Sequence, residues 1–214
     1  MIIPENEGII GSNSNRKTRE NMKVITISRD YGAGGHSIGT KVAETLGIEF
    51  YDRDIIKETA LEMGMDPGML EADEERITKG DSFLRAITPI SFDYKDSIFN
   101  YERNIIVKIA SEGPCVILGR CAGDILQKEG IDCLNVYLYA DQVHCAKRVG
   151  ELLGTQDLNV IAKEMKKRNA ARNSYFTYYT GKHLADARNW HMVLDTGILG
   201  YETCVKLICD AALA

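Results

Sequence analysis

Five short apolar runs divide the chain, and each is followed by a turn and then by a helical pattern. The runs lie at residues 24–28, 48–51, 115–118, 134–139 and 192–195. Apolar runs of this length, bounded by turns, are typical of strands that are buried on both faces. Because strands and helices alternate, the pattern predicts an α/β protein in which helices cover both faces of a parallel sheet.

The long interval between the second and third runs has a helical character of its own. Helical patterns occupy 54–64 and roughly 92–112, with a Pro-Gly break at 66–68 and an acidic stretch at 71–75 between them. We therefore expect an inserted helical arm within about 54–112.

Another long helical pattern, from about 157 to 178, carries a group of basic residues. They are Lys163, Lys166, Lys167, Arg168 and Arg172. Arg168 and Arg172 are four residues apart and therefore share one face of the helix. Two guanidinium groups on one face could bind phosphate oxygens, and the alternative is a solvated helix face.

The first 21 residues differ in composition from the rest of the chain. Residues 1–21 contain Gly, Ser, Asn and alternating charge with little periodicity, so we expect a flexible leader there. The remaining residues, 22–214, are expected to form a single domain, because one α/β domain with an insertion reaches this length.

Composition excludes several classes of function. The net charge of −5 argues against a general nucleic-acid or membrane-surface binder. No apolar run approaches the roughly 20 residues that span a membrane, and the N-terminal segment lacks a signal-peptide core. The six cysteines show no C-x-x-C spacing and are expected to be buried, reduced thiols. These features predict a cytoplasmic protein.

The turn after the first apolar run carries the most information. Gly32, Gly34 and Gly35 let its backbone N–H groups converge on an anion, and the next helix points its positive N-terminus at the same place. The usual phosphate-loop pattern, G-x-x-x-x-G-K-[ST], is broken because Arg29 stands at its first glycine and Gly35 at its lysine. Such a turn can also be only a tight connection between a strand and a helix.

Four stretches, in matching order and spacing, resemble the nucleoside monophosphate kinases and most closely the cytidylate kinase-like family. They are SRDYGAGGHSIG with the following helix KVAETLG, then IEFYDRDII, then VILGRCAGDIL, and finally KKRNAARNSY followed by ADARNWHMVLDTGILGYETCVKLI. The resemblance covers about 22–212. It implies a three-layer P-loop kinase fold with a five-stranded parallel sheet, an inserted nucleotide-binding arm within 54–112 and a mobile helical lid at about 160–188.

The activity that the resemblance implies is transfer of the γ-phosphoryl group of ATP to a nucleoside monophosphate, with Mg²⁺; the family name suggests CMP or dCMP. Such transfer needs mainly positive charge aimed at the phosphates. The expected catalytic residues are Arg120, Arg168 and Arg172. The residues expected to bind ATP are Arg29, Tyr31, Gly32, Ala33, Gly34, Gly35, His36 and Ser37, with the Ser37 hydroxyl facing Mg²⁺. The residues expected to bind the acceptor are Asp52, Arg53 and Arg120.

Several of these residues have a structural alternative. Arg120 could form a structural salt bridge, Asp52 could cap the next helix, and His36 could point at solvent. Asp141 looks like a plain helix N-cap. The aromatic residues of the lid segment have two possible roles, packing in the core or lid and stacking on a nucleotide base. They are Tyr175, Tyr178, Tyr179 and Trp190.

Two departures from the family pattern concern activity. The lysine of a phosphate loop normally binds the β- and γ-phosphates, and this chain lacks it. Arg29, His36 or Lys182 could take its place. Cys121 stands where cytidylate kinases carry an aspartate after their Gly-Arg pair. A weak or inactive nucleotide-binding regulatory protein and a kinase of another small molecule therefore stay open as alternatives, as does the oligomeric state.

Overall fold

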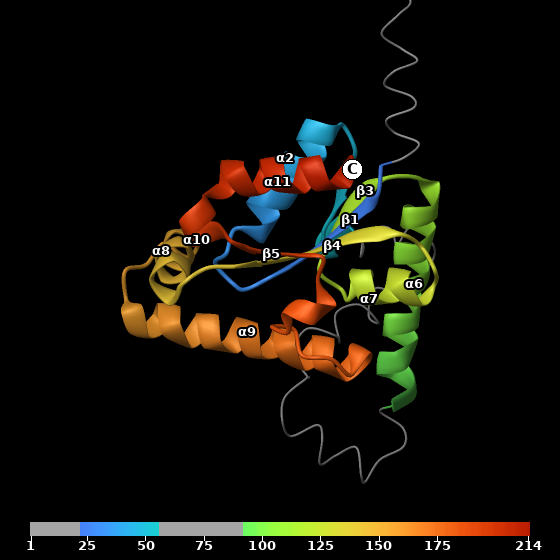
Figure 1. Ribbon diagram of the computed structural model, residues 1–214. Coiled ribbons are helices and arrows are strands. Elements are labelled where there is room, and N and C mark those ends of the chain that lie inside the picture. The colour runs from blue at the N-terminus through green and yellow to red at the C-terminus, as the bar shows by residue number, and fades with distance from the viewer. Residues whose placement is uncertain (1–21, 56–91) are drawn as a thin grey trace, which may run out of the picture.

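A computed structural model of the chain describes residues 22–55 and 92–214 and contains a five-stranded parallel sheet (Figure 1). The strands are β1 (Val24–Arg29), β2 (Glu49–Tyr51), β3 (Cys115–Leu118), β4 (Cys133–Tyr139) and β5 (Met192–Asp195). Their order across the sheet is β2-β3-β1-β4-β5, and all neighbours are parallel. Each apolar run of the sequence is therefore a strand, and the predicted fold class is confirmed.

The central position of β1 places the glycine turn at the middle of one sheet edge. Ile25 is paired with Val116 of β3 and with Leu134 of β4, and Arg29, the last residue of β1, is paired with Leu138. Because all the strands are parallel, the loops after them lie along the same edge. Ligands of open parallel sheets bind at this edge, where the strand order reverses.

Helices cover both faces of the sheet and complete the three layers. One face carries α2 (Gly35–Leu46) and α11 (Tyr201–Ala212), which lie side by side (Figure 1). The other face carries α6 (Phe92–Glu112), α7 (Ala122–Lys128) and α9 (Leu158–Thr180). The remaining helices are α8 (Gln142–Leu153), the 3₁₀ turn η2 (Ala187–Asn189) and α10 (Thr196–Leu199).

Each face of the sheet has its own apolar core. Ile25 and Ile27 of β1 are fully buried in the cluster that includes α2 and α11, whereas Val24 belongs to the cluster with α6 and α7. Since successive side chains of a strand point to opposite faces, one apolar run supplies both cores. All six cysteines are free and buried, as expected.

Aspartate side chains begin three of the helices. The Asp141 carboxylate accepts hydrogen bonds from the backbone N–H groups of Val143 and His144, so the predicted N-cap of α8 is confirmed. Asp157 and Asp195 cap α9 and α10 in the same way. The basic helical pattern of the sequence therefore forms one continuous helix, α9.

Some of the predicted elements lie outside the described residues. These are the leader at 1–21 and most of the helical arm, 56–91. The last helix of the arm, expected at roughly 92–112, is α6. Within 22–55 and 92–214, no helix is both long and apolar enough to cross a membrane.

Candidate functional site

The glycine turn after β1 has a backbone conformation that favours glycine. Gly32 and Gly34 have φ angles of +95° and +78°, and Ala33 between them is buried. A Cβ atom at Gly32 would lie 2.7 Å from the carbonyl oxygen of Cys145, and one at Gly34 would lie 2.2 Å from the Tyr201 ring. The turn is thus packed against α8 and α11, with the N-terminus of α2 directly after it. A glycine turn that leads into a helix N-terminus is a geometry in which backbone N–H groups can bind an anion.

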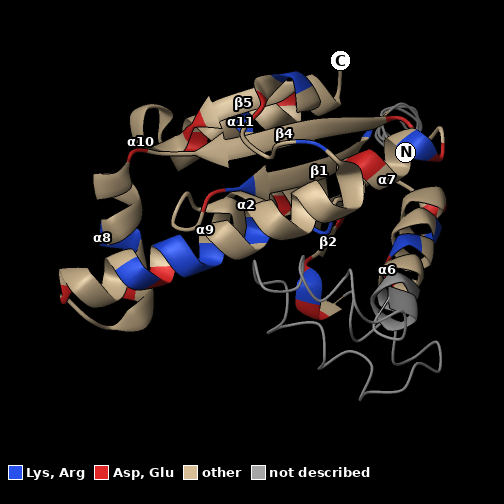
Figure 2. Ribbon diagram, turned by 90° about the horizontal axis from the view of Figure 1, so that it is seen from below, with Lys and Arg blue, Asp and Glu red and all other residues tan. Residues whose placement is uncertain are grey.

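The basic helix α9 contacts this turn. Lysines and arginines follow one another along α9 (Figure 2). The backbone N–H of Tyr31 donates to the side chain of Asn169 at 2.8 Å. The guanidinium carbons of Arg168 and Arg172 lie 5.8 and 5.4 Å from the centre of the Tyr31 ring, which is cation–π range. Arg172 Nη1 also donates to the backbone oxygen of Arg29 at 3.4 Å. The structure therefore brings both predicted arginines of α9 to the turn.

Arg168 and Arg172 differ in their electrostatic surroundings. Arg168 Nε donates to Glu164 Oε1 at 2.7 Å, and the Arg168 side chain is 54% exposed. Arg172 is half-buried, and burial together with the charge of Arg168 lowers the pKa of Arg172. In the part of the chain that the structure describes, no carboxylate lies within ion-pair distance of Arg172. The solvated-face alternative fits Arg168, whereas Arg172 is half-buried against the glycine turn.

Arg120 lies on a strained backbone segment at the end of β3. Gly119, Arg120 and Cys121 have φ angles of +82°, +55° and +55°. A non-glycine residue in this region costs on the order of 1 kcal/mol or more, and such strain is concentrated at functional sites. Arg120 Nη1 lies 3.3 Å from Glu102 Oε1, and the Tyr175 hydroxyl donates to Glu102 Oε2 at 2.7 Å. The ion pair that was the alternative for Arg120 is therefore present, and it orients the guanidinium.

The Arg29 side chain runs from the end of β1 past the glycine turn to the end of β3. Its Cγ lies 2.7 Å from the position that a Cβ atom would occupy at Gly35. Its Nη1 lies 2.5 Å from the position that a Cβ atom would occupy at Gly119. Burial and the charges of Arg172 and Arg120 lower the pKa of Arg29 to about 9. Three guanidinium groups, those of Arg29, Arg120 and Arg172, therefore converge beside the turn.

The end of β2 brings Asp52 and Arg53 to the same edge of the sheet. Asp52 Oδ1 accepts hydrogen bonds from the backbone N–H groups of Asp54 and Ile55 at 3.0 and 3.2 Å, so the helix-cap alternative is confirmed. Asp52 Oδ2 also lies 3.4 Å from His36 Nε2. Arg53 begins the next helix and is half-buried. Asp52 thus links the strand end to the first turn of α2.

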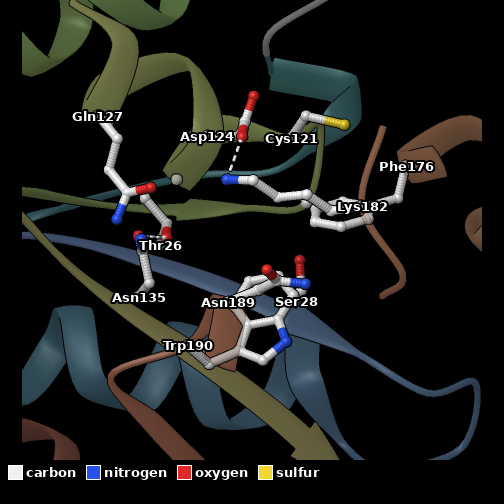
Figure 3. A pocket seen from close by; sticks show the side chains of 12 residues that line it. Thr26, Ser28, Cys121, Asp124, Gln127, Asn135, Phe176, Lys182, Asn189 and Trp190 are labelled. Carbon is white, nitrogen blue, oxygen red and sulfur yellow. Dashed lines mark hydrogen bonds and ion pairs between the residues drawn. The ribbon is translucent and has the colours of Figure 1, made fainter. Parts of the chain in front are cut away.

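Two further basic candidates, His36 and Lys182, are paired with other residues. The His36 side chain is 66% exposed, as its solvent-facing alternative expected, and it lies near Asp52. Lys182 Nζ donates to Asp124 Oδ1 at 2.7 Å, in a small pocket lined by α7 and the sheet (Figure 3). Asp124 Oδ2 is also 2.8 Å from Lys128 Nζ. Lys182 is therefore held by α7, and its Nζ faces Asp124.

Ser37 lies in the first turn of α2 and is half-buried. Across 22–55 and 92–214, no group of three or more His, Cys, Asp or Glu side chains could hold a metal ion. A Mg²⁺ ion at this place would therefore depend on the Ser37 hydroxyl and on phosphate oxygens, which are ligands that Mg²⁺ prefers.

The aromatic residues of the lid segment pack against α6 and the sheet. Tyr179 stacks on Phe99 with ring centres 3.9 Å apart, and Trp190 stacks on Tyr137 with centres 5.4 Å apart. Trp190 Nε1 also donates to the backbone oxygen of Leu184 at 2.9 Å. These contacts favour the packing alternative over a base-stacking platform.

Sequence analysis missed two residues of this site, Glu102 and Asn169. Asn169 lies three residues before Arg172, on the same helix face, and this position was an available signal. No motif marks Glu102, because its role depends on a contact between α6 and the end of β3.

Comparison with solved structures supports the architecture. The chain is similar to an uncharacterized protein from Eubacterium ventriosum, with a TM-score of 0.69 and 23% identity over 89% of this chain and 98% of that one. It is also similar to shikimate kinase from Acinetobacter baumannii in complex with shikimate, with a TM-score of 0.50 and 16% identity over 93% and 97% of the two chains. TT1252 from Thermus thermophilus gives a TM-score of 0.51 and 15% identity over 89% and 98%. At these identities the likenesses show the fold alone.

The comparison with family models is more specific. Comparison with curated proteins finds no significant match. A model of the cytidylate kinase-like family, however, matches residues 24–198, which include the glycine turn, the end of β3 and the whole of α9. The chain belongs to the cytidylate kinase-like family.

Proposed function

We propose that this protein transfers the γ-phosphoryl group of ATP to a nucleoside monophosphate, with CMP or dCMP as the favoured acceptor. The observation that carries the proposal is the convergence of Arg29, Arg120 and Arg172 beside the glycine turn. Among the described residues, Arg29 and Arg172 have no carboxylate within ion-pair distance. Guanidinium groups arranged in this way favour phosphate between them, and stabilising a transferring phosphoryl group is the main task of such an enzyme.

The glycine turn suits the phosphates of ATP. The positive φ angles of Gly32 and Gly34 turn backbone N–H groups inward, and the N-terminus of α2 adds its partial positive charge. The Ser37 hydroxyl would hold Mg²⁺ here. When bound, Mg²⁺ neutralises charge on the phosphate oxygens during transfer.

The acceptor is assigned to the ends of β2 and β3, which are neighbours in the sheet. Arg120, oriented by Glu102, binds the acceptor phosphate, and Asp52 and Arg53 lie at the adjacent strand end. This arrangement lets the acceptor approach the γ-phosphate from the side opposite the rest of ATP, as in-line transfer requires.

In this proposal α9 belongs to a lid, at about 160–188, within the single domain 22–214. Of its 23 residues only Ile161 and Phe176 are fully buried, and few apolar contacts hold the part of α9 before Tyr175 in one position. It carries Arg172 to the glycine turn. Closure over bound nucleotide would exclude water from the reaction.

We place the reaction in the cytoplasm. Six free, buried thiols suit a reducing compartment. The partners of the protein would be small-molecule nucleotides, since its net charge of −5 is unfavourable for nucleic acid or an anionic membrane.

The test is ADP release from ATP and Mg²⁺ with CMP, dCMP, UMP, AMP and shikimate offered separately. We expect release to depend on CMP or dCMP, to fall in Arg172→Ala, and to be unchanged in Lys206→Ala, since the Lys206 side chain lies on α11, outside the lid, and is 74% exposed. ADP release that depends on shikimate, and that none of the nucleoside monophosphates supports, would identify a kinase of another small molecule. ATP binding without release for every acceptor would identify a nucleotide-binding protein without turnover.

A further inference from the structure

The glycine at the lysine position of the phosphate loop leaves space for another side chain. A Cβ atom at Gly35 would lie 2.7 Å from Arg29 Cγ and 3.1 Å from both Arg29 Cβ and Cδ. These atoms belong to the stem of Arg29, whose backbone is fixed by its pairing with Leu138. A lysine at position 35 and an arginine at position 29 would therefore occupy the same space.

The head of Arg29 lies between the glycine turn and the acceptor side of the site. Its Nη1 lies 2.5 Å, and its Cζ 3.7 Å, from the place of a Cβ atom at Gly119, at the end of β3. Gly119 is followed by Arg120, and the Arg29 backbone oxygen accepts from Arg172. The guanidinium thus lies where the residues for the two substrates meet.

The Arg29 guanidinium has no carboxylate in direct contact among the described residues. Burial, and after it repulsion by Arg172 and Arg120, lower the pKa of Arg29 to about 9, against the opposing charge of Asp52. Three cations held this close together are stabilised by an anion placed between them.

Of the three candidates for the place of the absent lysine, Arg29, His36 and Lys182, only Arg29 has a side chain that overlaps the place of a residue-35 side chain. His36 is exposed and lies near Asp52, and Lys182 is bound to Asp124.

We propose that Arg29 is a catalytic residue of this protein, which takes the place of the phosphate-loop lysine by binding the β- and γ-phosphate oxygens of ATP. The inference rests on the proposed function. An acceptor oxygen attacks the γ-phosphorus, the bond from that phosphorus to the bridging oxygen breaks, and the electron pair leaves on ADP. Arg29 keeps its protons and donates hydrogen bonds to the oxygens on which negative charge increases.

The test exchanges the two residues. Arg29→Gly removes the guanidinium, Gly35→Lys adds a lysine beside it, and the double variant restores the usual G-x-x-x-x-G-K pattern. We expect Arg29→Gly to lower turnover about 100- to 1000-fold and the double variant to recover at least about tenfold of this loss. The affinities for ADP and for inorganic tripolyphosphate, measured by calorimetric titration, should rank the wild type and the variants in the same order as turnover does.

Stability gives a readout that does not depend on activity. Gly35→Lys alone should lower the melting temperature, because its stem overlaps the stem of Arg29, and Arg29→Gly should restore it in the double variant. If Arg29→Gly does not fold, Arg29→Gln keeps the stem and Arg29→Lys keeps the charge; the lysine variant should then bind tripolyphosphate more tightly than the glutamine variant.

The outcomes separate this inference from the proposed function. A wild-type protein that binds ADP but transfers phosphate to no acceptor would overturn the proposed function, and the affinities of the variants would still decide the role of Arg29. Unchanged ADP and tripolyphosphate affinity in Arg29→Gly would overturn the inference even if turnover with CMP is observed. If the double variant turns over no faster than Arg29→Gly, Arg29 does not take the place of the phosphate-loop lysine.

Discussion

In the proposed function, Arg172 serves the binding of phosphate rather than the stability of the fold. Burial and the charge of Arg168 lower the pKa of Arg172, so its charged form is disfavoured in the folded protein. In Arg172→Ala the lost repulsion offsets the lost contact with Tyr31. We expect the free energy of unfolding to change by less than about 1 kcal/mol, while ADP release falls about 100- to 1000-fold. Thermal unfolding and the ADP-release assay measure the two effects.

Lys206→Ala is the control for this variant, because Lys206 is an exposed cation on α11, outside the lid, and is paired with Asp210. In this control, the free energy of unfolding and the rate of ADP release should both stay at wild-type values. A loss of several kcal/mol in Arg172→Ala would show instead that Arg172 is a structural residue.

The cysteine thiols should be unreactive in the native protein. Burial raises the pKa of Cys115 to about 12 and those of Cys133 and Cys145 to about 11. Because the thiolate is the reactive form, iodoacetamide at mildly alkaline pH should modify the native protein slowly and all six thiols after unfolding in urea. Mass spectrometry counts the modified residues. Rapid modification of the native chain would contradict the burial of these thiols.

At this scale, the sequence predicted the residues of the glycine turn but not the direction of the Arg29 side chain. The turn is a local pattern, in which the spacing of the glycines between a strand and a helix predicts the bend of the backbone. The path of Arg29 depends on Gly119, which is far along the chain and adjacent only because β1 and β3 are paired.

Three elements meet at Glu102, and their contact supports a prediction at the scale of elements. Its carboxylate, on α6, accepts from Tyr175 of α9 and pairs with Arg120 at the end of β3. Hydrogen bonds to charged groups contribute about 1.5–3 kcal/mol, so Tyr175→Phe should lower the free energy of unfolding by about that amount in urea titrations. Tyr101→Phe, an exposed position of α6, should change it by less than about 0.5 kcal/mol. A Tyr175→Phe variant as stable as Tyr101→Phe would contradict this role of Glu102.

The packing of the glycine turn on α11 can be separated from its backbone conformation. Gly34 and Gly154 both have positive φ angles, +78° and +63°, but only a Cβ atom at Gly34 meets another side chain, the Tyr201 ring. Gly154→Ala should therefore lose about 1–2 kcal/mol of stability and keep its affinity for ADP. Gly34→Ala should lose more and bind ADP more weakly. Equal losses, with unchanged binding in both variants, would contradict the close packing of the turn.

The elements themselves were largely predictable, because a strand buried on both faces is a continuous apolar run. All five strands were found in this way, and a helical pattern of residues predicted α9. Its contact with the glycine turn through Asn169 was not, since helical periodicity indicates which residues share a face but not which element that face meets.

At the scale of the whole molecule, charge is distributed unevenly. The chain has a net charge of −5, yet Arg29, Arg120 and Arg172 come together at the carboxyl edge of the sheet. A local site of this kind attracts small anions without making the protein a general binder of polyanions. A ligand that bridges the turn and α9 would also fix the position of a helix that has few buried contacts.

This coupling between ligand and helix can be followed by proteolysis. Lys163, Lys166 and Lys167 are exposed on α9 between its two buried residues, Ile161 and Phe176. Trypsin must unfold the helix locally to cut there, so the rate follows the free energy of opening. At about 100 times its dissociation constant, a ligand bound only to the closed helix adds about 2.7 kcal/mol to that free energy and slows cleavage about 100-fold. We expect ADP to protect these sites in the wild type and to protect them much less in Arg172→Ala at the same ADP concentration. Cleavage at the same rate with and without saturating ADP would mean that α9 does not close over nucleotide.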